Sequence, residues 1–252
     1  MKETGGRTAR DQFLERYLRG EHKQVWAELR SHAALTDALR QEALEVSRET
    51  MRRVLRNSEL LISRLAGRGW LPFAGSFRIP PTEADARAIS EVEAGTGAPL
   101  PPSLKAFWEV VGGIVLFWDY EQDVPAPDFG LDLPMDELDP LTIDPARHGG
   151  WLFAEWKKEL ATADPEAIAP FRWDLAPDQL HKADFSGDLP YGVELPFLGA
   201  DPPFVNEEHR LSFVEYLRLA FRFAGFPGLE LYVQQADVRQ FIDEMTDGFV
   251  AF

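Results

Sequence analysis

Hydrophobic residues recur at steps of three and four in the first quarter of the chain, and this spacing predicts amphipathic helices. The clearest apolar stripe predicts a long helix that begins at Thr36 or Asp37 and ends at Gly67. Two shorter helices are expected over residues 12–19 and 21–32. Each of these helices has one apolar face, so the region is expected to bury that face against other parts of the protein.

A run of glycine and proline residues at 67–76 interrupts the helical pattern and redirects the chain. A second interruption follows at Pro80 and Pro81. We therefore expect two parts: a helical N-terminal extension over residues 1–78 and a main domain over residues 79–252.

The polar face of the long predicted helix is rich in arginine. Its charged residues are Arg48, Arg52, Arg53 and Arg56, interleaved with Glu45 and Glu49. Such a face is typical of a solvated surface with weak ion pairs at helical spacing. The alternative is that this basic stripe docks on the acidic domain that follows.

The start of the main domain carries several helix signals. Residues 82–85 have the spacing of a capping box, with Asp in place of the usual Glu, and predict a short helix that ends at Gly95. Prolines at 101–102 suit the first turn of the next helix, where the missing amide hydrogen costs little. Two glycines at 112–113 are expected to end that helix, because the position after a helix often has positive φ.

The rest of the domain mixes both kinds of element. The pattern predicts strands at 114–120, 131–133, 141–143, 191–195 and 229–233, and helices at 151–160, 213–224 and 236–245. Because the elements do not alternate regularly as β-α-β units, the predicted fold class is α+β.

Composition indicates an ordinary globular protein. The chain of 252 residues is 45% apolar and has no cysteine, which excludes disulfides and thiolate metal sites. The first residues lack the apolar core of a signal peptide, and the longest apolar run, at 110–118, is far shorter than the ~20 residues of a membrane span. A cytoplasmic protein is the expected class.

The net charge of −16 narrows the choice of partner. Residues 1–70 hold 14 Lys and Arg against 10 Asp and Glu, whereas residues 71–252 hold 12 against 32. This acid excess repels phosphate backbones, so we expect neither nucleic acid nor a membrane as partner. It would attract a basic protein and speed the encounter, or it serves solubility alone.

The acidic excess is densest between residues 119 and 144, where no Lys or Arg occurs. Aromatic residues accompany the carboxylates, and an aromatic anchor with surrounding acid suits contact with a basic protein. The predicted partner-binding residues are Trp118, Asp119, Tyr120, Glu121, Asp123, Asp128, Asp132, Asp136, Glu137 and Asp139. A solvated loop is the simpler alternative. The spacing at 119–123 also resembles a calcium loop, but the glycine and distal glutamate of such loops are missing.

Catalytic and metal-binding signals are weak. The chain has no GxSxG sequence, no P-loop and no paired-histidine motif for zinc. Glu207, Glu208 and His209 could contribute to a metal site, although an exposed lead-in to the next helix explains them more simply. Asp178 and His181 lie three apart and could form an acid–base pair, but nothing nearby in the sequence supplies a nucleophile. We expect no cofactor, no metal and no catalytic residue.

One segment resembles a known family. A short helix, a Leu-Pro turn, a second helix and Gly-Gly before an apolar strand are similar to the core signature of the SUKH superfamily. These proteins include fungal cell-wall-assembly regulators and immunity proteins of bacterial polymorphic toxin systems. The matching positions are Ile89, Glu93, Leu100, Pro101, Leu104, Phe107, Trp108, Gly112 and Gly113. The run at 178–187, then Tyr191, and the long helix from Phe213 follow in the expected order, so the resemblance covers roughly residues 80–230.

The chain departs from the family pattern in two places. Val111 stands where the family often has Asn, and the segment at 119–170 is long and acidic. The resemblance implies a curved mixed β-sheet flanked by helices. It also implies a protein-binding function, often the blocking of a toxin's active site.

The resulting functional hypothesis is a non-catalytic immunity protein that occludes a basic toxin domain through its acidic surface. The alternative is a housekeeping adaptor or regulatory protein of the same fold. A third, an unrecognised hydrolase, requires a polar pocket in which histidines and carboxylates converge.

Overall fold

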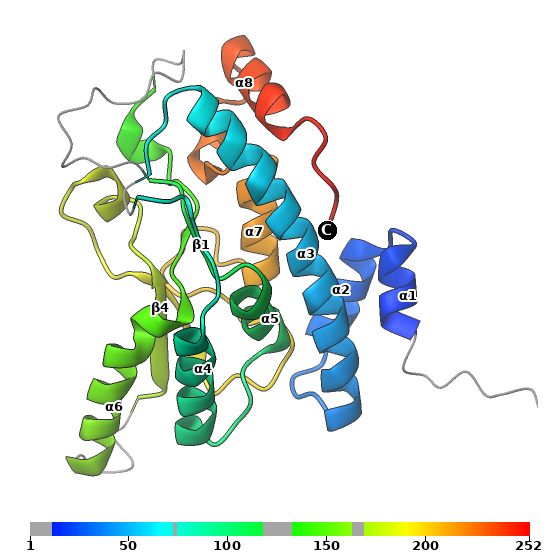
Figure 1. The fold of residues 1–252 in the computed structure, drawn as a ribbon, viewed down its shortest axis with the longest axis vertical. Helices are drawn as coiled ribbons and strands as arrows, with labels where there is room; N and C mark the ends of the chain where they lie inside the picture. The colour runs from blue at the N-terminus through cyan, green and yellow to red at the C-terminus, as the bar shows by residue number, and fades with distance from the viewer. Residues whose placement is uncertain (1–11, 73–74, 118–132, 163–168) are drawn as a thin grey trace, which may run out of the picture.

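The computed structural model describes residues 12–72, 75–117, 133–162 and 169–252 (Figure 1). Its α-helices are α1 Gln12–Leu18, α2 His22–Arg30, α3 Asp37–Gly67, α4 Glu83–Thr96, α5 Pro102–Val110, α6 Gly150–Thr162, α7 Phe213–Arg222 and α8 Ala236–Thr246. Its strands are β1 Arg78–Ile79, β2 Gly113–Val115, β3 Thr142–Ile143, β4 Phe171–Ala176 and β5 Tyr191–Leu195. Short 3₁₀ helices are η2 Met135–Glu137, η3 Ala146–Gly149, η5 His181–Ala183 and η6 Pro227–Tyr232.

Helix α3 lies along the molecule, with α1 and α2 to one side, α5 to the other and α7 behind it (Figure 1). Its predicted bounds are confirmed, because the Thr36 hydroxyl accepts a hydrogen bond from the Leu39 amide at 3.4 Å and the helix ends at Gly67. The buried Trp26 indole of α2 donates to the Thr50 hydroxyl of α3 at 3.1 Å. Neither α3 nor any other helix in the described residues is long and apolar enough to cross a membrane.

The described strands form two small antiparallel sheets. One has the order β1-β2-β3 and the other pairs β4 with β5. A hydrogen bond from the Asp144 amide to the Leu175 carbonyl, at 2.7 Å, joins the end of β3 to β4. The predicted α+β class is confirmed. No parallel pair occurs among the described strands, which differs from the single mixed sheet that the family resemblance implies.

Buried side chains on both sides of the predicted boundary at 78/79 form one hydrophobic cluster. Trp26 and Val46 from the N-terminal helices belong to it together with Phe107 of α5 and Phe213 of α7. The Phe107 and Phe213 rings meet edge to face, 5.4 Å between centroids. The division into 1–78 and 79–252 stays a prediction, and the apolar stripe of α3 contributes to the same core as the residues that follow.

Two glycines act as helix signals in the described residues. Gly112 has φ 90°, and a Cβ there would lie 2.2 Å from the Ile79 carbonyl oxygen, so the position after the C-cap of α5 must be glycine. Helix α4 ends at Thr96, one residue beyond the predicted end at Gly95, and its C-cap is Gly97 with φ 70°. Gly95 is helical, and the Phe153 ring of α6 packs against it closely enough that a Cβ would lie 2.4 Å from a ring carbon.

The predicted strand at 229–233 is wrong. Residues 227–232 form the 3₁₀ helix η6, in which Leu229 is buried and Leu231 is exposed. Pro227 sets a helical φ at its start, and the Gly228 amide donates to the Leu138 carbonyl at 3.1 Å. The leucines that alternate in the sequence therefore do not share one face, and Leu229 alone of the two is buried.

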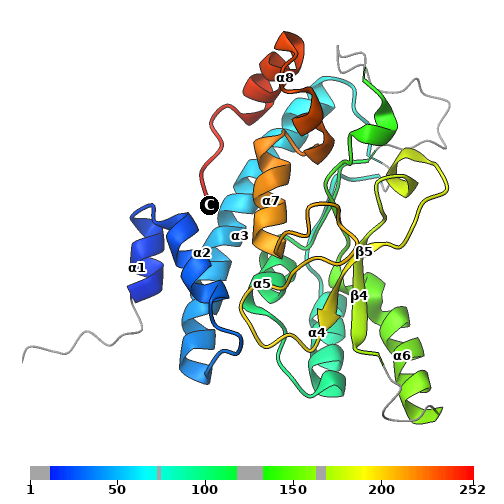
Figure 2. The same ribbon diagram turned by 180° about the vertical axis from the view of Figure 1, so that it is seen from behind.

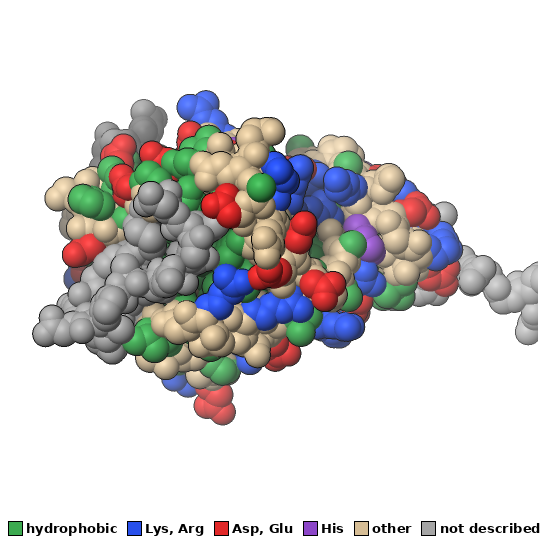
Figure 3. All heavy atoms as spheres, turned by 90° about the horizontal axis from the view of Figure 1, so that it is seen from above, with side chains coloured by type: hydrophobic (Ala, Val, Ile, Leu, Met, Phe, Trp, Pro, Cys, Tyr) green, Lys and Arg blue, Asp and Glu red, His purple; other side chains and the backbone are tan. Residues whose placement is uncertain are grey.

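Both alternatives considered for the arginine face of α3 apply: some of its arginines pair within the helix, and others contact residues of the following part of the chain. Arg52 and Arg53 pair with Glu49 on the same helix, whereas Arg48 reaches Glu109 of α5 at 3.1 Å. Arg53 also donates to the Ala251 carbonyl at 2.9 Å. Figure 3 looks down on the molecule and shows Lys and Arg side chains gathered across its middle, interleaved with Asp and Glu.

Candidate functional site

Most of the predicted partner-binding residues lie outside the described residues: Trp118, Asp119, Tyr120, Glu121, Asp123, Asp128 and Asp132. Two of the others, Asp136 and Glu137, lie in η2 and are half-buried. Asp139 follows η2 and is only 7% exposed. Burial removes Asp139 from the side chains that a partner could touch in this structure.

Asp139 instead forms a buried ion pair. Its carboxylate lies 2.6 Å from the Lys182 Nζ, and the Lys182 side chain is fully buried. The same ammonium group lies 4.6 Å from the centre of the Tyr191 ring. Because a buried charge without a partner is costly, this pair fixes η5 against the segment that follows η2. The Gln179 amide strengthens that attachment by donating to the Asp136 carbonyl at 2.7 Å.

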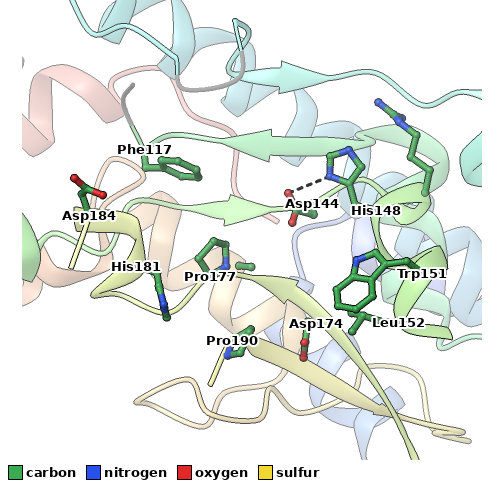
Figure 4. Close-up of a pocket in the computed structure, with 12 residues that line it drawn as sticks. Phe117, Asp144, His148, Trp151, Leu152, Asp174, Pro177, His181, Asp184 and Pro190 are labelled. Atoms are coloured by element: carbon green, nitrogen blue, oxygen red, sulfur yellow. Dashed lines mark ion pairs between the residues drawn. The ribbon is translucent and has the colours of Figure 1, made fainter. Parts of the chain in front are cut away.

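Next to this pair is the acidic cleft, a recess of about 990 Å³. Figure 4 shows His148 and Trp151 on one side of the recess and His181 and Asp184 on the other. Its lining residues are Phe117, Asp144, Arg147, His148, Trp151, Leu152, Asp174, Ala176, Pro177, His181, Asp184 and Pro190. Short segments after β2, β3 and β4 meet the start of α6 here, which brings distant parts of the chain together.

The 3₁₀ helix η3 forms one wall of the cleft, and it is held by the capping box at residues 82–85. Asp85 is 2% exposed, and its carboxylate accepts hydrogen bonds from the Thr82 amide and hydroxyl, both at 2.8 Å. It also accepts from the Arg147 amide at 2.9 Å and pairs with the Arg147 guanidinium at 2.7 Å. Burial alone would raise the pKa of Asp85, but these hydrogen bonds outweigh it and lower the pKa. One carboxylate thus starts α4 and positions the cleft wall.

Asp144 lies at the inner end of the cleft. Its backbone carbonyl accepts a hydrogen bond from the Trp108 indole at 2.9 Å, and its carboxylate lies 3.6 Å from the His148 Nδ1 (Figure 4). The Asp144 side chain is 37% exposed to water, and protein atoms cover the rest of it. This desolvation raises the pKa of Asp144, and the attraction of His148 and Lys182 only partly offsets it.

Asp174 is the second carboxylate of the cleft. Residues alternate along β4, so that Phe171, Trp173 and Leu175 are buried while Arg172 and Asp174 face the other side. Burial raises the pKa of Asp174, and Arg172 partly offsets the shift from 2.9 Å. The two charged atoms are close but not aligned for a hydrogen bond.

His181 and Asp178, considered from the sequence as an acid–base pair, are in contact through the His181 Nδ1. Asp178 also accepts hydrogen bonds from the Leu180 and His181 amides, at 2.9 and 3.3 Å. Burial would raise the pKa of Asp178, but the ring and amide hydrogen bonds prevail and lower it. His181 itself is half-exposed and lines the cleft.

The possible metal residues Glu207 and His209 form a different arrangement. The His209 ring lies between two carboxylates, 2.6 Å from Glu207 and 2.5 Å from Glu230. Burial would lower the pKa of His209, but its hydrogen bonds to Glu230 and Glu207 raise it to about 9. A doubly protonated His209 therefore ties the segment before α7 to η6. No group of three or more His, Asp or Glu residues in the described part of the chain is arranged to hold a metal ion.

The chemistry of the acidic cleft suits a cation with an apolar stem. Asp144, Asp174 and Asp184 provide negative charge, and Leu152 and the 67% exposed Trp151 provide apolar surface. The described residues that line the cleft include no Ser, Thr or Cys that could act as a nucleophile. The sequence interpretation missed Trp151, Asp174 and Asp184 as site residues. Only the alternation along β4 signalled the outward position of Asp174.

Comparisons with protein-family models, curated proteins and solved structures found no match to this chain. The SUKH resemblance therefore depends on the residues quoted above, and the functional argument depends on the cleft.

Proposed function

We propose that this protein is a cytoplasmic, non-catalytic immunity protein with a SUKH-like fold, which neutralises a basic bacterial toxin domain by occluding it. The observation that supports the proposal is the acidic cleft with Trp151 exposed at its rim. The acidic segment at 118–139 is contiguous with the cleft in sequence, since Phe117 lines the recess.

The raised pKa values of Asp144 and Asp174 explain why a cation would be favoured in the cleft. Desolvation disfavours both charged carboxylates in the free protein. A lysine or arginine side chain from a partner would supply positive charge and favour the ionised form of both groups. Trp151 would cover the apolar stem of such a side chain, or stack on a guanidinium group.

A toxin domain is the partner class that fits this chemistry best. Enzymes that cleave nucleic acid must hold phosphate and therefore have Lys- and Arg-rich active sites. The net charge of −16 would attract such a surface and speed the encounter. A housekeeping adaptor would use the same cleft for a different basic protein.

Co-expression separates these two functions. The chain would be produced together with toxin domains encoded near its gene, and survival of the host would be scored. We expect rescue from one toxin, and loss of rescue when Asp144, Asp174 and Asp184 are all changed to Asn. Asp237→Asn on α8, which removes a charge away from the cleft, is the matched control. A growth defect on deletion in the absence of any toxin would favour the adaptor.

A hydrolase is the second candidate, because the structure contains the required convergence of histidines and carboxylates. The contact of His181 with Asp178 leaves the Nε2 atom of His181 to act as a base toward water. Purified protein would be assayed with activated carboxylic and phosphoric esters, beside the His181→Gln variant. Turnover that His181→Gln abolishes would replace the immunity function, whereas inert protein would support it.

A further inference from the structure

A second recess, the basic groove, lies on a different part of the molecule from the acidic cleft. It has a volume of about 890 Å³ and is formed by α2, α7 and residues 246–252. In Figure 2 the chain end marked C lies between α2 and α7. The residues that decide its chemistry are Lys23, Arg218, Leu219, Arg222, Phe249 and Phe252.

The groove is built from facing stripes of two regular helices. On α2 the lining positions are 23, 27 and 30, and on α7 they are 215, 218, 219, 221 and 222. Steps of three and four place each set on one helix face. Arg30 crosses between the helices to Glu215 at 2.8 Å, and Arg218 donates to the His22 carbonyl at 3.3 Å.

Basic side chains outnumber acidic ones among the residues that line the groove. Glu215 is the acidic residue among the lining residues, and Arg30 already pairs with it. Arg218 donates to a terminal oxygen of Phe252, the last residue of the sequence, at 2.7 Å and to the His22 carbonyl at 3.3 Å, and burial lowers its pKa. Lys23 and Arg222 are exposed and form no ion pair with any carboxylate in the described residues.

The inner surface of the groove is aromatic. Phe221 is buried, and its ring meets those of Phe249 and Phe252 at centroid distances of 5.8 and 5.7 Å. Leu219 adds aliphatic surface beside them. A ligand that matched both parts would place an apolar body on these rings and an anionic group among the cations at the rim.

We propose that the basic groove binds a small amphipathic anion, in which one acidic group is attached to an apolar body such as an alkyl chain. A small ligand is favoured because the net charge of −16 repels long polyanions and anionic membranes, whereas charge screening over about 8 Å leaves the local attraction intact. The proposal is independent of the immunity function, because the groove and the acidic cleft share no lining residue.

Three matched probes test the proposal by isothermal titration calorimetry on the full chain. Octanoate has both the charge and the apolar body, octanol has only the body, and acetate has only the charge. We expect octanoate to bind about tenfold or more tightly than either of the others, since a hydrogen-bonded charge and a buried chain each contribute. Equal binding of octanol would overturn the proposal, because the cations would then be irrelevant.

Variants locate the site. The double change Lys23→Gln with Arg222→Gln removes two exposed cations and is expected to weaken octanoate binding by about tenfold. Arg87→Gln on α4 is the control for loss of an exposed arginine. Octanoate binding that survives the double change, or falls equally with Arg87→Gln, would refute the assignment. Capture of the protein by phosphatidylglycerol vesicles would also contradict it, by showing a membrane surface as the source of the anion.

Discussion

The acidic cleft and the basic groove are similar in size and opposite in construction. Both are lined by aromatic residues, at about 990 and 890 Å³. The cleft takes its charges from strand β4 and from short segments that follow β3 and β4, held by buried pairs such as Lys182–Asp139. The groove takes its charges from one face each of α2 and α7. A site built on helix faces therefore depends on local spacing, whereas a site built on loops and strand ends depends on the interior that supports them.

The largest expected effect comes from Lys182→Met, which leaves Asp139 buried without a partner. We expect a loss of about 3–5 kcal/mol in the free energy of unfolding, measured by urea denaturation. Adding Asp139→Asn should recover part of this loss, because the unpaired charge is then removed. In the folded fraction, binding at the cleft should weaken while octanoate binding at the groove persists. If ligand binding weakened equally at both recesses, both would depend on the Lys182–Asp139 pair.

His209→Gln removes the contacts of His209 with Glu207 and Glu230, which lie outside both recesses. The pKa of His209 is raised from 6.5 to about 9, so its stabilisation is complete below about pH 6.5 and is lost as pH rises through about 9. We expect the variant to lose about 2 kcal/mol near neutral pH and almost nothing above about pH 10, by denaturation at each pH. A loss that does not change with pH would show that packing, and not charge, is what the ring contributes.

The pH dependence of ligand binding should separate the two recesses. A hexa-arginine peptide is expected to bind the cleft about tenfold more weakly near pH 4 than near pH 7, because the raised pKa values of Asp144 and Asp174 let both carboxyl groups take up protons in this range. The groups facing them, His148 and Lys182 for Asp144 and Arg172 for Asp174, are all basic. Charge on the groove arginines stays constant there. Fluorescence titration would measure the affinity of the peptide at each pH. An affinity that does not change with pH would exclude Asp144 and Asp174 as the groups that bind it.

The smallest expected effect is that of Arg48→Gln on the exposed face of α3. Its ion pairs with Glu45 and Glu109 are partly solvated, so we expect a loss below about 1 kcal/mol that disappears in high salt. Neither peptide nor octanoate binding should change. A larger loss would mean that the arginine face helps to hold α3 on α5.

Local signals predicted much of the fold. The helix at 37–67, the capping box at 82–85 and the glycine at 112 each depend on neighbours within a few positions, and the structure confirms all three. The prediction of a strand at 229–233 failed because Pro227 begins a 3₁₀ helix, in which Leu229 is buried and Leu231 is exposed, so the alternation does not mark a sheet face.

The cleft could not be predicted in the same way. Asp144 follows β3 while Asp174 lies in β4, and the contact between these strands is set by the tertiary fold. The acidity of the segment that contains Asp139 was visible in the sequence, but its burial against Lys182 was not, since the two residues are 43 positions apart. His181 and Asp178 were found because they lie three positions apart.

Two indole rings in close, tilted contact give the protein an intrinsic optical probe beside the cleft. Trp108 and Trp173 lie 4.3 Å apart, with Trp108 bonded to the main chain of Asp144 and Trp173 adjacent to Asp174. Coupled electronic transitions between such close rings produce a paired band in near-ultraviolet circular dichroism. A guest that shifts either aspartate would change that band, so occupancy could be followed without a label or a tag.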